Sequence, residues 1–116
     1  MTKVEDTYTS GDWLVKEGNE QLFIDQWAAV AEWCLTHARG ARFFRLIRDR
    51  SNLRHFVSFG EWDDFESVGV ARSYPRFLEL FRGCQDLCER FTGSDYTVAL
   101  AAPEVTLTRP PRPDPP

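Results

Sequence analysis

Few residues in this 116-residue chain could perform chemistry, and their spacing argues against the common catalytic and metal sites. We find no glycine-rich phosphate loop, no Ser-His-Asp spacing and no Cys/His metal pattern. The three cysteines are odd in number, which argues against a disulfide framework, and all lie in helical patterns. Cys84 and Cys88, four residues apart on one predicted helix face, match half of a metal site. We interpret both, with Cys34, as buried small side chains, so the sequence predicts no metal.

The other polar candidates have structural explanations. Asp63 and Asp64 precede Phe65 and Glu66 in a pattern that is typical of a helix start. A capping role therefore explains these carboxylates better than acid–base chemistry does. His55 lies on a predicted hairpin, where we expect an exposed or interfacial hydrogen-bonding residue, with a catalytic base as the alternative.

Aromatic side chains are better candidates for a binding pocket. Trp13, Trp27 and Trp33 could each line one. Trp27 and Trp33 lie six residues apart in one predicted helix, so they cannot share a narrow face. We expect Trp27 in the pocket and Trp33 at its periphery.

Hydrophobic periodicity predicts the elements that position these residues. The predicted elements are a strand at residues 12–17, a helix at 20–37, two strands within 43–62 joined at 49–52, a short helix to about 72, a longer helix from 75 to 91 and a strand at 96–101. This order fits a ferredoxin-like α+β fold, in which a four-stranded antiparallel sheet carries its helices on one face.

Charge and apolar pairing predict the register of the hairpin. We expect Asp49 opposite Arg54, Arg42 opposite Glu61, Leu46 opposite Val57 and Phe44 opposite Phe59. In this register Arg45 lies opposite Ser58. The face that Arg45 and Ser58 share also carries Phe56 and Trp62.

Both faces of the hairpin are apolar, whereas the predicted helices can cover only one. Each large apolar side chain left in water costs about 1.5–3 kcal/mol. A patch of this size exceeds what monomers usually expose. We therefore expect a homodimer in which a second copy of the protein covers the other face.

Composition and charge limit the possible function classes and indicate the domain boundaries. A net charge of −4 without a basic stripe gives no support for nucleic-acid binding, and no apolar stretch approaches a membrane span. The first residues lack a signal-peptide core, so we expect a cytoplasmic protein. We predict a flexible N-terminus at residues 1–11, a single domain at 12–102 and a Pro-rich tail at 103–116. The tail could form an edge strand at 104–109 and could bind a proline-reading module, but a solvated tail is the simpler interpretation.

The chain resembles the antibiotic biosynthesis monooxygenase superfamily over about residues 10–102. The motifs that carry the resemblance are Gly18-Asn19-Glu20 before Phe23 and Trp27, the segment 56–65, and Ser73-Tyr74-Pro75-Arg76-Phe77. The resemblance implies a dimeric α+β barrel. Characterised members include cofactor-independent oxygenases that act on aromatic polyketides or quinols, and haem-degrading enzymes.

The resemblance also implies a pocket between the sheet and its own helices. Some cofactor-free oxygenases of this type carry a polar residue four positions before a tryptophan, and Ser58 and Trp62 look like that pair. A guanidinium at Arg45 would favour the anion of a phenolic substrate, which is the form that reduces O2. The alternative is that Arg45 pairs with a carboxylate at the sheet edge and Trp62 is core. The substrate-binding residues that we predict are Trp27, Arg45, Phe56, Ser58, Trp62 and Phe81.

Two departures from the family pattern bear on chemistry. Haem-degrading relatives use a helical histidine and an asparagine on the first strand, and residues 12–17 contain no asparagine. Other relatives have a histidine where this chain has Val70-Ala71-Arg72, which removes the most obvious general base. Haem degradation is therefore disfavoured, and the missing histidine favours a non-catalytic protein. From the resemblance we expect a monooxygenase without metal or flavin, acting on a small quinol-type or anthrone-type molecule. A non-catalytic dimeric binding module and a polyketide cyclase are the alternatives.

Overall fold

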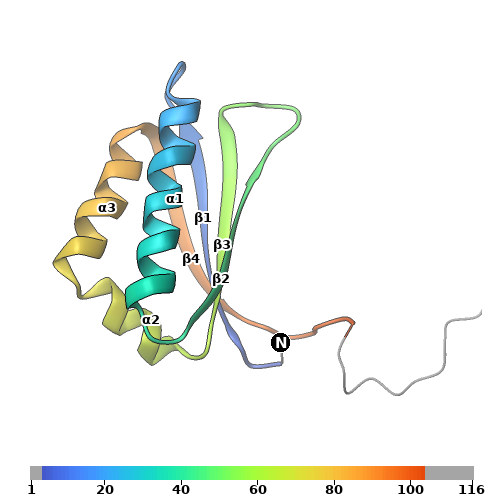
Figure 1. The fold of residues 1–116 in the computed structure, drawn as a ribbon. Helices are drawn as coiled ribbons and strands as arrows, with labels where there is room; N and C mark the ends of the chain where they lie inside the picture. The colour runs from blue at the N-terminus through green and yellow to red at the C-terminus, as the bar shows by residue number, and fades with distance from the viewer. Residues whose placement is uncertain (1–3, 104–116) are drawn as a thin grey trace, which may run out of the picture.

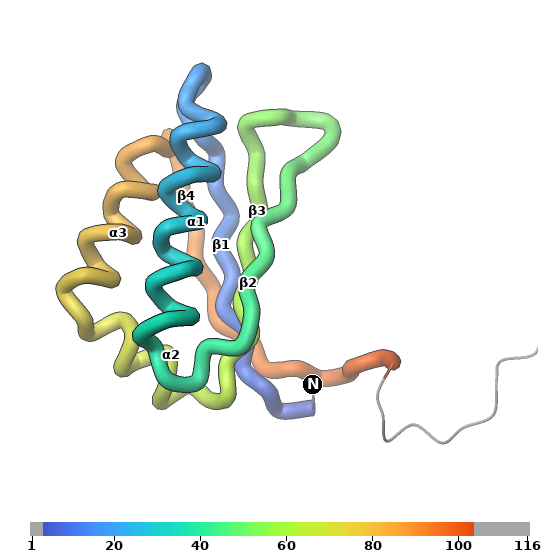
Figure 2. Tube along the Cα trace, viewed as in Figure 1, coloured from blue at the N-terminus to red at the C-terminus, as the bar shows by residue number. Residues whose placement is uncertain are grey.

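The computed structural model describes residues 4–103, which form one layer of strands and one layer of helices (Figure 1). The elements are β1 (Thr7–Val15), α1 (Glu20–His37), β2 (Ala41–Arg48), β3 (His55–Trp62), α2 (Phe65–Arg72), α3 (Pro75–Asp86) and β4 (Cys88–Thr97). The strands make one antiparallel sheet in the order β2-β3-β1-β4. Helices α1 and α3 lie side by side on one face of this sheet (Figure 2). The predicted ferredoxin-like α+β fold is confirmed.

Helix α1 has the predicted bounds, and its apolar stripe faces the sheet. Phe23, Trp27, Val30 and Cys34 are buried on this stripe. The chain leaves α1 through Gly40, whose φ of +91° lies in the left-handed region that glycine adopts without strain. A Cβ at this position would also collide with the side chain of Ser67. The turn into β2 therefore depends on glycine for both conformation and space.

Strand β1 begins earlier than its apolar residues suggested. The prediction that residues 1–11 precede the first strand is wrong for Thr7 to Gly11, which pair with β3 on one side and β4 on the other. A central strand has both rows of backbone groups hydrogen bonded by its neighbours. The length of β1 is therefore set by those neighbours and not by its own hydrophobicity.

The boundary between α3 and β4 also differs from the prediction. The helix predicted to reach residue 91 ends at Asp86, and the last strand runs over Cys88–Thr97 instead of residues 96–101. Phe91 pairs with Trp13 across the β1–β4 ladder, so its apolar side chain belongs to a strand. Cys84 and Cys88 consequently do not share a helix face. All three cysteines are free and buried, as predicted.

The predicted hairpin register is wrong by one residue. Leu46 lies opposite Ser58 and Arg45 lies opposite Phe59. A bulge between Ala41 and Phe43 shifts the strand, and the Arg42 side chain still reaches Glu61, with Nη1 and Oε2 3.5 Å apart. Because side chains alternate between faces, the shift moves the β2 side chains that follow the bulge, from Phe43 to Arg48, to the face opposite the one predicted.

Two further predictions concern parts of the chain that these elements do not include. The edge strand predicted for residues 104–109 lies outside the described residues, and so does the tail predicted for residues 103–116, apart from Pro103. Among residues 4–103, no helix combines the length and the hydropathy that crossing a membrane requires.

Candidate functional site

A cavity of about 470 Å³ lies between the sheet and the helices. Its lining includes Thr9, Phe44, Ser58, Gly60, Trp62, Phe91, Gly93 and Asp95 from the sheet, and Trp27, Val30, Cys34, Val68, Ala71, Arg72, Phe77, Leu78 and Phe81 from the helices. Size and apolar character both match ordinary small-molecule sites. The walls are rich in aromatic rings: Phe44 packs edge-on against Trp27 and Trp62, with ring centroids 6.1 and 5.6 Å apart. This arrangement suits a flat aromatic ligand.

Four of the six predicted binding residues line this cavity, namely Trp27, Ser58, Trp62 and Phe81. Phe56 is instead a core residue, 2 % exposed, whose ring packs 5.2 Å from that of Phe23.

Arg45 is not in the cavity, and its predicted position opposite Ser58 is wrong. Because it pairs with Phe59, its side chain projects from the sheet face that the helices do not cover. There its guanidinium lies 5.0 Å from the ring centroid of Phe43, and Nη1 donates to the carbonyl of Phe44.

Two indole groups hold two hydroxyl groups in the cavity wall. Trp13 Nε1 donates to Ser58 Oγ at 3.0 Å, and Trp62 Nε1 donates to Thr9 Oγ1 at 3.1 Å. Trp13 itself is fully buried and packs against Phe91, with ring centroids 4.2 Å apart. The two bonds fix the oxygen positions of hydroxyl groups that a bound molecule can reach.

The ionisable groups that line the cavity are either paired or neutral. Arg72 Nη1 and Nη2 donate to the two carboxylate oxygens of Asp95 at 2.9 and 2.7 Å. This bidentate bond lowers the pKa of the Asp95 carboxyl. Burial raises the pKa of the Cys34 thiol to about 12, so this thiol is neutral and poorly nucleophilic. Since Arg72 and Asp95 are both exposed, their pair marks where the cavity meets solvent.

Sequence reasoning missed several of the lining residues. Thr9 was overlooked because the strand was expected to begin at residue 12, and Asp95 because residues 92–95 resemble a loop. The alternation of Thr7, Thr9, Gly11 and Trp13 on one face was a usable signal for an early strand start.

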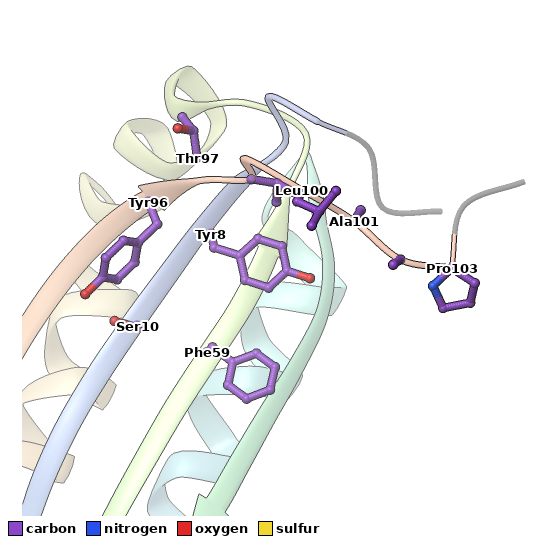
Figure 3. A pocket seen from close by; sticks show the side chains of 10 residues that line it. Tyr8, Ser10, Phe59, Tyr96, Thr97, Leu100, Ala101 and Pro103 are labelled. Carbon is purple, nitrogen blue, oxygen red and sulfur yellow. The ribbon is translucent and has the colours of Figure 1, made fainter. Parts of the chain in front are cut away.

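The opposite face of the sheet has a more open hollow of about 560 Å³ (Figure 3). The rings of Tyr8, Phe59 and Tyr96 project into it from β1, β3 and β4, and Leu100 lies beside them. The rings of Tyr8 and Phe59 stack with centroids 6.3 Å apart. Because no described helix lies over this face, the hollow is a surface for contact and not an enclosed site.

His55 lies away from the cavity, at the loop end of the hairpin. Its Nδ1 is 2.9 Å from Asp49 Oδ2 and its Nε2 is 3.1 Å from Asp12 Oδ1. The hydrogen bond with Asp49, followed by that with Asp12, raises the pKa of the imidazole. Within residues 4–103 no cluster of three or more His, Cys, Asp or Glu side chains has a geometry that would bind a metal.

Comparison with known proteins identifies relatives of the fold. A family model described as antibiotic biosynthesis monooxygenase matches residues 12–83. SnoaB, a cofactor-independent oxygenase from Streptomyces nogalater, superposes with a TM-score of 0.77 at 20% identity over 86% of this chain and 99% of its own. A conserved protein from Methanosarcina mazei Go1 gives a TM-score of 0.73 at 17% identity over 81% and 93% of the two chains. No curated protein matches the chain.

Proposed function

Because the chain belongs to the antibiotic biosynthesis monooxygenase family, we propose that it oxidises a flat aromatic quinol or anthrone with O2, using no metal or flavin. The observation that supports this most is the aromatic-walled cavity of about 470 Å³ between the sheet and the helices. SnoaB, which has a similar fold, is described as a cofactor-independent oxygenase. The substrate itself supplies the electrons in this proposal.

The reaction balances with O2 as the sole co-reactant. An anthrone loses one proton from its ring carbon and forms an electron-rich anion. Transfer of electrons to O2 and formation of a carbon–oxygen bond give a hydroperoxide, which loses water. One oxygen atom remains as the new carbonyl of the quinone, and the other leaves as water with the two hydrogens of the ring carbon.

The part of the protein in this reaction is to hold the substrate anion out of bulk water. Trp27, Phe44 and Phe81 provide apolar walls, and the Arg72–Asp95 pair lies where solvent would enter. In a site with little water, hydrogen-bond donors aimed at the anion stabilise it more than they would in solution.

Oxygen consumption tests this proposal. The protein is mixed with 9-anthrone or a substituted hydroquinone, and O2 uptake and quinone absorbance are followed together, with heat-denatured protein as the control. We expect uptake above the uncatalysed rate, with one O2 consumed for each anthraquinone formed. Uptake equal to that of the denatured control for every compound would rule the oxygenase out.

A second candidate function is non-catalytic binding of the same aromatic class. It is favoured by the ionisable groups that line the cavity, since Asp95 is held by Arg72 and neither it nor Cys34 is suited to act as a general base. Quenching of tryptophan emission by anthrones without O2 uptake would support this function.

We also propose that the protein works as a homodimer through the sheet face opposite the helices. Phe43 and Phe59 lie on this face, and Ile47 and Tyr96 are 52% and 55% exposed there. Contiguous apolar and aromatic surface of this kind is typical of interfaces. A second copy of the same face would cover it.

A further inference from the structure

An ion pair joins the two layers of the fold where the cavity meets solvent. Arg72 is the last residue of α2 and Asp95 belongs to the edge strand β4, and both are exposed residues that line the cavity. Their bidentate bond joins Nη2 to Oδ1 at 2.7 Å and Nη1 to Oδ2 at 2.9 Å. Within residues 4–103, these two are the hydrogen bonds that side chains of α2 make with β4. The pair therefore ties a helix to a strand at the mouth of the cavity.

The N-terminal end of α2 is anchored separately. The chain enters this helix through Asp63, whose carboxylate accepts a hydrogen bond from Arg42 Nε at 2.6 Å. The backbone N–H of Asp63 donates to the carbonyl of Gly40 at 2.9 Å. Because Arg42 and Gly40 lie at the start of β2, these bonds fix the beginning of the helix to the sheet. The pair at Arg72 acts on the other end.

The inner face of α2 packs on the cavity. Its two buried side chains, Val68 and Ala71, both line this space. On the helix surface, a Cβ at Gly69 would meet nothing within 4 Å. A short helix with open space beneath it loses few packing contacts when one end moves. The C-terminal end of α2 is therefore a part of the cavity wall that can move at low cost.

We infer that the Arg72–Asp95 pair is a latch, which must part for an aromatic molecule to enter or leave the cavity. This inference rests on the proposed function, because it assumes an aromatic ligand in this cavity. An exposed ion pair shifts an equilibrium by about fivefold at most, so the latch slows passage without blocking it. The other described residues that line the cavity are uncharged, so we expect salt to act on passage through this pair.

The binding kinetics of a neutral probe test the latch. The probe is 2-naphthol, which is uncharged at about pH 7 because phenolic groups titrate at about pH 10. Its binding is followed by stopped-flow quenching of tryptophan emission, since Trp27 and Trp62 lie in the cavity wall. For the wild-type protein we expect the association and dissociation rate constants to rise together, about threefold, between about 20 mM and about 500 mM NaCl. The dissociation constant should then stay nearly constant.

Two substitutions each remove one charge of the latch. Asp95→Asn and Arg72→Met should each raise both rate constants about fivefold at low salt and remove most of their dependence on NaCl. The dissociation constant should change less than about twofold in either variant. The double variant should match either single variant, because each substitution breaks the same contact. Should Arg72→Met fail to fold, Asp95→Asn alone gives the comparison with the wild-type protein.

Glu79→Gln is the matched control. It breaks an exposed ion pair on α3, in which Arg76 Nη1 lies 2.8 Å from Glu79 Oε1. Neither residue lines the cavity. This variant should therefore keep the rate constants of the wild-type protein and their dependence on NaCl.

The latch and the proposed function can fail separately. Association rate constants that stay unchanged in the variants would overturn the latch and leave the aromatic cavity standing, and so would a dissociation constant that changes through the dissociation rate alone. A wild-type protein that binds no aromatic probe would refute both the latch and the proposed aromatic site. Absence of O2 uptake alone would refute the oxygenase and not the latch, which requires binding only.

Discussion

At the scale of single residues, glycine at position 60 keeps the floor of the cavity open. A Cβ there would lie 2.5 Å from the Phe44 ring, which itself packs against Trp27 and Trp62. We predict that Gly60→Ala lowers the free energy of unfolding by about 1–3 kcal/mol, because the ring must move in a packed wall. The same variant should bind aromatic probes more weakly.

Gly69→Ala is the matched control for this prediction. Gly69 lies within α2, and a Cβ there would meet nothing within 4 Å. Alanine should stabilise the helix by about 0.5–1 kcal/mol. Urea unfolding of both variants provides the measurement, and equal stability of Gly60→Ala and wild type would contradict the packing argument.

At the scale of elements, His55 joins the hairpin loop to β1 through Asp49 and Asp12. These carboxylates raise the pKa of the imidazole above its usual value of 6.5. A raised pKa means that the stabilisation is fully present below the unfolded pKa and is lost as the pH rises through the folded pKa. We predict that the free energy of unfolding falls between about pH 6 and pH 8, and that His55→Gln reduces this dependence.

The slope of stability against pH is the quantity that tests the His55 prediction. Gln85→Ala, a change of an exposed polar side chain on α3, should keep the wild-type slope. Identical slopes for His55→Gln and wild type would show that the cluster does not couple to folding. The lowered pKa of the Asp49 carboxyl affects the free energy of unfolding in a separate pH range. The stabilisation that it represents is lost only as the pH falls into the acid range.

The same hairpin shows why elements are easier to predict than their pairing. Periodicity located both strands, but charge pairing chose a register one residue away from the one that the structure adopts. Cross-strand charge pairs contribute at most about 1 kcal/mol each. Burial of Phe44, Leu46 and Trp62 against the helices is worth more, and the bulge near Arg42 lets its ion pair with Glu61 persist.

At the scale of the whole molecule, the proposed homodimer makes a clear prediction. Tyr96→Glu places a charge in the aromatic patch of the uncovered sheet face and should shift sedimentation toward the protomer mass. Leu22→Glu changes a residue of similar exposure, 59%, on the solvent side of α1 and should leave sedimentation unchanged. A wild-type protein that sediments as a protomer at micromolar concentration would refute the dimer.

The sequence by itself determined the features that depend on the spacing of residues within one segment. The bounds of α1, the buried stripe from Phe23 to Cys34 and the cavity position of Trp27 follow from a 3.6-residue period within one segment. The motifs that resemble those of antibiotic biosynthesis monooxygenases also identified the family to which the chain belongs.

Only the tertiary structure decided which residues face each other. The start of β1 and the end of α3 were set by pairing between strands far apart in the chain, and Arg45 changed face when the hairpin register moved by one residue. Because alternate side chains of a strand point to opposite faces, local composition cannot fix such pairings, whereas burial across the whole sheet can. Thr9 joined Ser58 in the cavity for the same reason.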